Sequence, residues 1–355
     1  MLITIISFFA VIVVLILAHE LGHFMTAKAS GVKVEEFALG FGPRLLSIKR
    51  GETVYSLHAL PLGGFCKMAG EEDPKVPGSL ASKSIGTRIL VLSAGSLMNL
   101  LLPILLLSIA FMVPHTMVTE PVVVQEVAPN SPADRADIEA GDVIISINEK
   151  LVHNTGYLRR YIFLNLGQEI TLLAEHGDST KEVQLIPRWK PPEGEGAIGI
   201  GIDVDAAMAN RTVVSQSYPF WEAIPLGAST CIETFVLFKN GIISMIIGAT
   251  PVAFAGPVGI AQLTGEVVRA GISPLLVFAA FLSINLAIIN IFPLPALDGG
   301  RIVFVLLEWV RRGKRISPKT EGLVHFIGFA MLMTVIAIIT YQDIIRIISG
   351  EALIP

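Results

Sequence analysis

The chain has 355 residues, of which 52% are apolar and only 16% are charged, and its mean hydropathy is +0.67. Soluble domains carry about 25% charged residues, so this composition excludes a purely soluble protein and predicts several membrane spans beside a soluble portion. The net charge of −4 gives no reason to expect a nucleic-acid partner, and the two cysteines, Cys66 and Cys231, give neither a disulfide framework nor a thiolate zinc site.

The first predicted span covers residues 1–28. The run from Met1 to Ala18 is apolar except for Thr4 and Ser7. It lacks a basic leading region and a clean small-residue cleavage site, so we expect a retained span and not a cleavable signal peptide.

The last third of this span carries the sequence His19-Glu20-Leu21-Gly22-His23. On a helix, the two histidines lie about 6 Å apart along one face and can share a metal ion, while Glu20 can hold a water without ligating the metal. This is the zinc-protease meaning of H-E-x-x-H, and a chance match is the alternative. Ionisable side chains are expensive at membrane depth, which favours a functional role.

Residues 29–87 are predicted to form a cytoplasmic β-hairpin and loop region. Apolar and polar residues alternate on both sides of Arg50-Gly51-Glu52, as in a hairpin, and Gly63 and Gly64 follow in a glycine-bearing loop. An unpaired strand edge there could hold a substrate by β-addition, and an ordinary hairpin is the alternative. We expect the polar stretch 71–84 to be a flexible loop.

A second span is predicted over residues 88–114, where small residues allow close helix packing and Asn99 is expected to bridge to another helix. Residues 115–205 change to a small α/β domain with a first strand predicted over Val122–Val127. The order of its elements and the phrase from Ser131 to Asn148 resemble a PDZ domain, which implies a peptide-groove strand near Val122–Gln125. Residues 206–272 are expected to be amphipathic and membrane-associated, although a further span within 218–254 is possible.

The third span is predicted over residues 273–310. It leads into a stretch with two prolines and two paired glycines, which is irregular backbone of the kind tolerated at membrane depth only inside protein or beside a watery cavity. Asp298 lies within this stretch. A basic cytoplasmic loop (311–321) and a fourth span (322–345) follow.

The charge pattern sets the expected topology. Basic residues after the first span and in the 311–321 loop indicate cytoplasmic segments, so both chain ends and the small domain are expected outside. Asp298 then reaches the cytoplasmic side of the third span, at the depth of His19 and His23. Two histidines, one carboxylate and an open fourth position make a catalytic zinc set.

With these motifs the chain resembles the site-2 protease family of intramembrane zinc metalloproteases, in its bacterial RseP-like branch. The resemblance rests on His19-Glu20-Leu21-Gly22-His23, on Leu297-Asp298-Gly299-Gly300, and on an inserted segment, Ser131 to Asn148, that is similar to a PDZ domain. The chain departs from RseP in having one PDZ domain where RseP has two. The expected fold class is therefore a multi-spanning α-helical membrane protein of about four transmembrane helices, with a membrane-associated β-hairpin region and an inserted α/β PDZ domain.

The resemblance implies that His19, His23 and Asp298 bind Zn²⁺ and that Glu20 is the general base. It also implies a location in the bacterial inner membrane and cleavage of single-span proteins such as anti-sigma factors or remnant signal peptides, with a peptide or substrate ectodomain at the PDZ domain. The candidate substrate-binding residues are Asn285, Asn290, Pro293, Pro295, Gly63 and Gly64. For the two asparagines a structural amide bridge is the alternative.

Two other functions compete with this one. A metal transporter or chaperone could use intramembrane histidines and an aspartate as transport ligands, but it has no use for Glu20 and the four spans show no inverted repeat. An inactive protease homologue acting as a scaffold is disfavoured because all four expected catalytic residues are present.

Overall fold

The computed structural model describes all residues except 178, 204–207, 251–254 and 351–355. The chain divides into two compact units. Unit 1 comprises Met1–Ala110, Ala223–Ala228 and Ala253–Pro355, and unit 2 comprises Phe111–Glu222 and Ser229–Val252. The boundary predicted between residues 205 and 206 lies outside the described residues.

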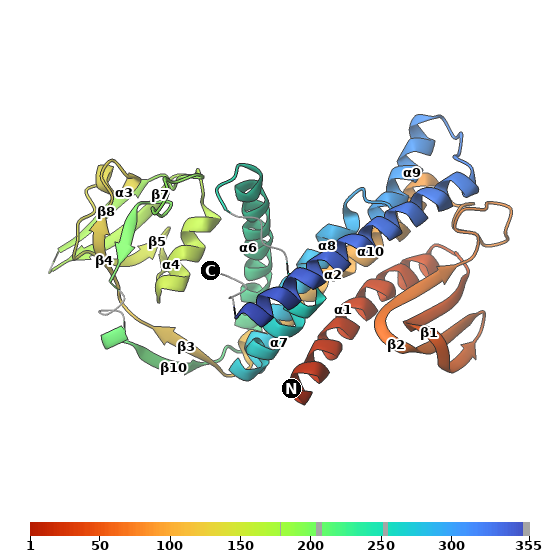
Figure 1. The fold of residues 1–355 in the computed structure, drawn as a ribbon, viewed down its shortest axis with the longest axis horizontal. Coiled ribbons are helices and arrows are strands. Elements are labelled where there is room, and N and C mark those ends of the chain that lie inside the picture. The colour runs from red at the N-terminus through yellow and green to blue at the C-terminus, as the bar shows by residue number, and fades with distance from the viewer. Residues whose placement is uncertain (178, 204–207, 251–254, 351–355) are drawn as a thin grey trace. The chain divides into compact units, whose positions relative to one another are not determined.

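Unit 1 contains most of the long helices and two long strands. Its elements are α1 (Leu2–Ala29), β1 (Val34–Arg50), β2 (Thr53–Met68), α2 (Ile85–Met112), α7 (Pro257–Ala270), α8 (Ile272–Ile291), α9 (Asp298–Val310) and α10 (Pro318–Ser349). Helix α7 contacts α1, α8 and α10, and these helices run beside one another in Figure 1.

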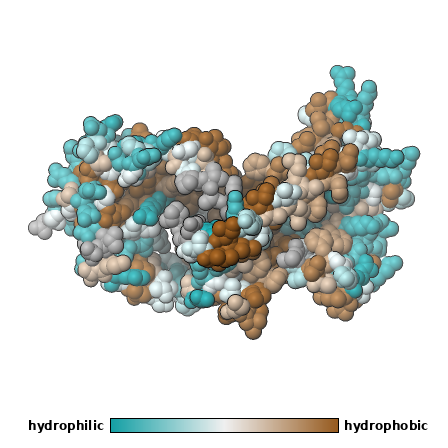
Figure 2. Space-filling model, in the orientation of Figure 1, coloured by the Kyte–Doolittle hydropathy of each residue, from teal (hydrophilic) through white to brown (hydrophobic). Residues whose placement is uncertain are grey.

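Five helices among the described residues are long and apolar enough to cross a membrane. They are α1, α2, α8 and α10, which correspond to the four expected spans, and α6 (Phe220–Ile246). Helix α10 buries very little of its apolar surface, and Figure 2 shows apolar side chains along its exposed face. Exposed apolar side chains along long helices are what a lipid environment requires.

Residues 273–310 form two helices separated by an irregular segment. Helix α8 ends at Ile291, just before Pro293, and α9 begins at Asp298. Proline has no backbone donor, so the helix cannot continue through Pro293 and Pro295. The N–H of Ala296 donates instead to His325 Nδ1 on α10, at 3.0 Å. The break therefore places Asp298 in the first turn of a new helix.

Strands β1 and β2 fold back on each other to make four strand segments. The Val34–Leu39 half of β1 pairs on one side with Gly64–Met68 and on the other with Val54–Leu57. The second half of β1, Arg44–Arg50, pairs with the outer side of the segment that begins at Thr53, around the predicted hairpin turn. Among the described residues the Gly64–Met68 segment has one strand partner, so it forms an edge of this sheet.

The polar stretch 71–84 is a loop, as predicted, and several of its residues make backbone hydrogen bonds; its expected flexibility stays a prediction. The N–H of Leu80 donates to Ala69 O at 3.0 Å, and that of Ala81 donates to Gly70 O at 3.2 Å. The side chains of Leu80 and Ala81 are buried. A polar composition does not reveal which polar groups of a loop form local hydrogen bonds.

Unit 2 contains a small α/β domain and part of α6. Its elements are β3 (His115–Thr119), β4 (Val122–Val127), α3 (Pro132–Arg135), β5 (Val143–Ile147), β6 (Lys150–Leu151), α4 (Thr155–Leu164), β7 (Ile170–His176), β8 (Ser179–Leu185), β9 (Ile200–Ile202) and β10 (Thr212–Gln216). The main sheet has the order β8-β7-β5-β4-β9, with β6 beside β5, and a separate ribbon pairs β3 with β10. Its core includes Val122, Ile144, Leu158 and Leu172.

The expected groove strand, β4, lies inside the sheet. It pairs with β5 on one side and with β9 on the other, so it has no free edge for a peptide. Among the described residues the outer strand on that side is β9. The prediction missed this because β9 comes about 75 residues later in the chain, and its pairing is a long-range contact.

Candidate metal centre

Three side chains from two distant segments converge in unit 1. His19 and His23 lie on consecutive turns of α1, and Asp298 opens α9. The His19 Nε2 and His23 Nε2 atoms are 3.2 Å apart, and both face Asp298 Oδ2, at 3.0 and 3.1 Å. Among the described residues this is the one group of three His, Cys, Asp or Glu side chains able to hold a metal ion. The structure thus brings together the three predicted ligands.

The spacing of these atoms fits a tetrahedral metal site. A Zn²⁺ ion with bonds of about 2.0–2.1 Å keeps neighbouring ligand atoms roughly 3.3 Å apart. The three observed separations of 3.0 to 3.2 Å lie close to that value. The donor set of two imidazoles and one carboxylate leaves a fourth position open, as catalytic zinc sites require.

The second nitrogen of each imidazole is oriented by a neighbour. His23 Nδ1 lies 2.7 Å from the carbonyl oxygen of Val91 on α2, to which it can donate, leaving Nε2 as the ligand atom. His19 Nδ1 faces the Asn290 carboxamide on α8, with Asn290 Nδ2 at 3.4 Å. Turning that amide over would offer its oxygen to the imidazole N–H. Asn290 therefore lies directly behind a predicted ligand.

Glycine residues on α1 and α2 make room for the imidazoles. A Cβ atom on Gly95 would lie 2.4 Å from His23 Nε2 and 2.7 Å from His19 Nε2. A Cβ atom on Gly22 would lie 2.3 Å from the carbonyl oxygen of Ala94, so the two helices approach at the backbone. Small residues allow such close helix contact in membranes. The two helices thus form a cradle that only glycine fits.

Glu20 lies beside the three ligands, at the wall of a cavity of about 460 Å³. The cavity is lined by His19, Glu20, His23, Phe41, Gly64, Phe65, Cys66, Lys67, Met68, Glu71, Leu92, Ala296, Asp298 and Arg301. The backbone of Cys66 hydrogen-bonds the Glu20 carboxylate. The edge segment of β2 therefore forms one wall of the cavity that contains the proposed metal ligands.

Cys66 is not suited to bind a metal. Burial, followed by the nearby charges of Glu20 and Glu71, raises the pKa of its thiol to about 12. The thiol stays protonated at neutral pH, whereas metals bind the thiolate.

Of the remaining predicted substrate-binding residues, some line this cavity and others do not. Gly64 lines it, and Gly63 lies against the ring of Phe41. Pro295 packs against Gly328 of α10, and Pro293 lies in the bend between α8 and α9. Asn285 donates to Phe281 O one turn earlier on α8, at 2.9 Å.

Some predicted contacts differ in the structure. The Asn99 side chain is fully buried, yet its carboxamide has no hydrogen-bond partner among the described residues. Its backbone oxygen accepts the hydroxyl of Ser283 on α8, at 2.8 Å. The bridge to another helix therefore uses the main chain at this position and not the predicted amide. Gly95, Glu71 and Arg301 were not among the predicted site residues. The one available signal was that Arg301 lies one helical turn after Asp298.

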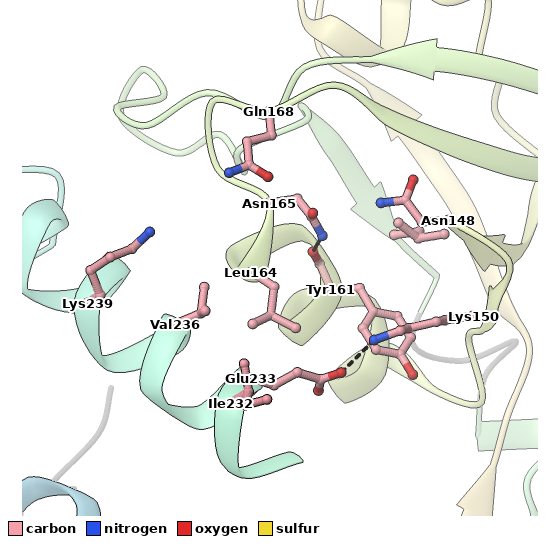
Figure 3. A pocket seen from close by; sticks show the side chains of 11 residues that line it. Asn148, Lys150, Tyr161, Leu164, Asn165, Gln168, Ile232, Glu233, Val236 and Lys239 are labelled. Atoms are coloured by element: carbon pink, nitrogen blue, oxygen red, sulfur yellow. Dashed lines mark hydrogen bonds and ion pairs between the residues drawn. The ribbon is translucent and has the colours of Figure 1, made fainter. Parts of the chain in front are cut away.

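A second cavity, of about 310 Å³, lies within unit 2 (Figure 3). It separates α4 and the β5–β6 turn from α6. Glu233 reaches across to Lys150 and Arg160, and Asn240 donates to Phe163 O at 2.7 Å. Its lining holds no cluster of potential metal ligands, so we assign the chemistry to the cavity beside Asp298.

Comparison with known proteins identifies the family. The family model for peptidase family M50 matches residues 7–335. A protein of Clostridium acetobutylicum that carries a zinc metalloprotease name is 37% identical over 350 residues, 96% of this chain and 98% of that protein. Zinc metalloprotease RasP of Geobacillus kaustophilus is 31% identical, covering 96% of this chain and 97% of that protein.

Two further similarities concern particular relatives. The regulator of sigma-W protease RasP of Bacillus subtilis is 28% identical, covering 97% of this chain and 99% of that protein. Among solved structures, the PDZ domain of an SdrC-like protein from Listeria monocytogenes is 25% identical over 24% of this chain and 90% of that domain, with a TM-score of 0.22.

The family match spans nearly the whole chain. Together with the long apolar helices of the described residues, this family makes the protein a multi-pass membrane protein. The chain belongs to peptidase family M50, the site-2 proteases, and is a metalloendopeptidase of that type.

Proposed function

We propose that the protein cleaves single-span membrane proteins within or near their transmembrane segments, using a Zn²⁺ ion held by His19, His23 and Asp298. The convergence of these three side chains beside Glu20 carries the proposal. A bound Zn²⁺ would supply Lewis acidity toward the scissile carbonyl. The cradle at Gly95 and the donor set both suit this ion.

Glu20 is the proposed general base. It lies next to the ligands in sequence and in the cavity wall without being part of the group of three. Its carboxylate can take a proton from the attacking water and pass it to the leaving amine nitrogen. The Cys66 backbone and the α1 helix hold the carboxylate in place for both transfers. Val91 and Asn290 orient the two imidazoles from behind.

A transmembrane substrate must unwind to expose a peptide bond, and we propose that the edge segment Gly64–Met68 receives it as an added strand. This segment has a strand partner on one side only and borders the cavity, although its Met68 N–H already donates to Glu71 and its Cys66 backbone bonds Glu20. Gly63 and Gly64 keep side chains away from that edge. Asn290, Pro293 and Pro295 would shape the opposite wall, and Asn285 is proposed as a more distant contact.

Helix directions in unit 1 support a proposed membrane topology. Thr4, near the start of α1, lies against Gly265 of α7, which precedes α8, whereas His19, near its end, lies against Asn290 at the end of α8. Helices α1 and α8 therefore run in the same direction. Helix α2 runs back along α1, because Val91 near its start lies against His23 and Ala94, one turn later, lies against Gly22. The end of α2 and the start of α8 are therefore expected on the same membrane face.

An even number of crossings must then separate α2 from α8. Among the described residues α6 is the single candidate between them, and one crossing cannot satisfy this condition. We propose that α6 lies along the membrane and does not cross it, giving four spans. Its polar side chains support this, because Glu233 and Asn240 bind the small domain of unit 2 and not lipid.

We place the metal centre toward the cytoplasm of a bacterial inner membrane and the small domain outside. The basic residues that follow α1 and α9 support this orientation. We propose that residues 115–205 form a PDZ domain that contacts a peptide or the substrate ectodomain, with β9 as the strand edge nearest that role. Anti-sigma factors and remnant signal peptides are the proposed substrates, and one relative is named as a regulator of a sigma factor.

The proposal is tested by reconstituting the protein in detergent or liposomes with tagged single-span substrates. Cleavage should require metal and Glu20, and the cut should fall in or beside the transmembrane segment. Cysteine labelling at both ends of α6 should report the same, outer, face. Labelling on opposite faces would contradict the four-span topology without touching the assignment of the metal ligands.

A further inference from the structure

The strand edge and the helix that carries Asp298 are joined by one carboxylate. Glu71 Oε1 accepts the backbone N–H of Met68, the last residue of β2, at 3.0 Å. Glu71 Oε2 accepts from Arg301 Nη1 at 2.7 Å. Arg301 lies one turn after Asp298 on α9, and both line the cavity. A single side chain thus spans from the end of the strand edge to the helix that carries a proposed ligand.

The backbone around Glu71 is rigid enough to transmit this link. Gly70 adopts a left-handed φ of +48°, and a Cβ there would lie 2.5 Å from Asp73 O. Just before Glu71, Ala69 N donates to Lys33 O at 2.8 Å, and Gly70 O accepts from Ala81 N at 3.2 Å. The carboxylate therefore emerges from a fixed point on the 69–84 loop.

The far end of α9 is tied to the same loop. Arg315, which follows α9, donates to the backbone oxygen of Ala81 at 2.7 Å. Glu308, in the last turn of α9, is buried and pairs with both Arg315 and Arg88 of α2. Because α9 is held at its far end, the Glu71–Arg301 pair fixes its near end, where Asp298 lies.

We propose that Glu71 is a positioning residue that sets the distance between the substrate-binding strand edge and the metal centre, acting through Arg301 and the Met68 N–H. This rests on the proposed function of both sites. The role needs two acceptor oxygens, one for each partner. Glutamine keeps an oxygen for Met68 but turns an amide donor toward the guanidinium, so Glu71→Gln breaks the link to α9 alone.

The test separates the metal centre from the strand edge by using two inhibitors. Acetohydroxamate binds a metal alone, whereas a peptide hydroxamate also needs the strand edge in register with the metal. Purified full-length protein is compared as wild type, Glu71→Gln, Arg301→Leu and the double variant. Zinc content, both inhibition constants, and KM and kcat for a single-span substrate are measured.

We expect Glu71→Gln to retain zinc and acetohydroxamate affinity but to weaken the peptide hydroxamate about 10-fold, the typical effect of losing a charge-assisted hydrogen bond. Arg301→Leu should give the same loss, and the double variant should lose no more, because both changes remove one interaction. The matched control is Glu35→Gln, which removes an exposed ion pair with Lys67 of the same strand segment but has no link to α9. It should behave as wild type.

Wild-type affinity for the peptide hydroxamate in Glu71→Gln would overturn the proposal. Equal loss of zinc or of both inhibitors would also overturn it, since that result marks a general structural role. An additive double variant would mean that Arg301 acts on the substrate directly. If the wild-type protein neither binds the hydroxamates nor cleaves, the proposed function itself fails, and that outcome is distinct from the others.

Discussion

Replacing Gly95 by alanine should disable the metal centre while leaving the fold intact. The added Cβ would lie 2.4 Å from His23 Nε2 and 2.7 Å from His19 Nε2. Carbon and nitrogen atoms in contact normally stay about 3.4 Å or more apart, so the His23 ring must retreat by roughly 1 Å. Metal sites tolerate ligand displacements of about 0.2 Å. The His23 ring is also anchored on its other side by Val91, which limits how it can move.

The expected consequence is a loss of zinc affinity and of at least about 100-fold in cleavage rate, the usual effect of a 1 Å misplacement in an active site. Zinc content by mass spectrometry and cleavage of a single-span substrate are measured on the same purified samples. Gly86→Ala is the matched control, because it adds the same methyl group to the same helix at a position where no atom lies within 4 Å of the new Cβ.

Gly86→Ala should be neutral or slightly stabilising, since alanine favours helix by about 1 kcal/mol over glycine. Full zinc occupancy and wild-type cleavage in Gly95→Ala would refute the claim that only glycine at this position leaves room for the two imidazoles. Equal damage from both substitutions would mean that α2 responds to any added side chain and that the imidazoles are not specifically crowded.

Three further outcomes are expected. Asp298→Ala should weaken zinc binding by more than about 100-fold. Removing a residue that only hydrogen-bonds a ligand typically costs up to about 100-fold in metal affinity, and removing the ligand itself should cost more. An unchanged zinc affinity in a metal titration would contradict the role of Asp298 as a ligand. Gly64→Ala should reduce cleavage more than Gly63→Ala, measured as kcat/KM, since a Cβ at Gly64 meets backbone at 2.9 Å whereas one at Gly63 meets only the movable ring of Phe41. Although burial alone would raise the pKa of Asp142, the hydrogen bonds that it accepts from the Glu139 backbone, Lys181 and His176, together with the charge of Lys181, lower it, so its stabilising effect is present above about pH 4 and is lost as the pH falls further. The hydrogen-exchange protection of β5 in the full-length protein, taken relative to the intrinsic exchange rate at each pH, should fall below that pH, and Asp142→Asn should remove this part of the pH dependence.

The metal centre could be predicted from the sequence because the positions of its ligands follow rules that depend only on nearby residues. The spacing of His19 and His23 fixes a shared helix face, and the prolines before Asp298 require a break in the helix. Basic residues follow the first span and fill the 311–321 loop, which predicts that both metal-ligand segments lie near the cytoplasmic side of the membrane. These signals depend on neighbouring residues, and the structure brings the three side chains together.

Features set by long-range pairing could not be anticipated in this way. The strand edge of the small domain is β9, which reaches β4 across most of that domain. The 71–84 loop bonds to Lys33, Ala69 and Arg315, which lie outside it, and its composition gave no signal for these partners. Gly95 looks like any small residue in an apolar helix until the imidazoles of α1 are placed against it.

The most direct test of the central claim is the Glu20→Gln variant, purified in detergent beside the wild type and incubated with a tagged single-span substrate. Zinc content is measured on the same samples. The account predicts one zinc ion per chain in both proteins, cleavage by the wild type that a chelator abolishes, and no cleavage by Glu20→Gln. Full cleavage by the zinc-loaded Glu20→Gln variant would contradict the assignment of Glu20 as the general base and, with it, the proposed mechanism.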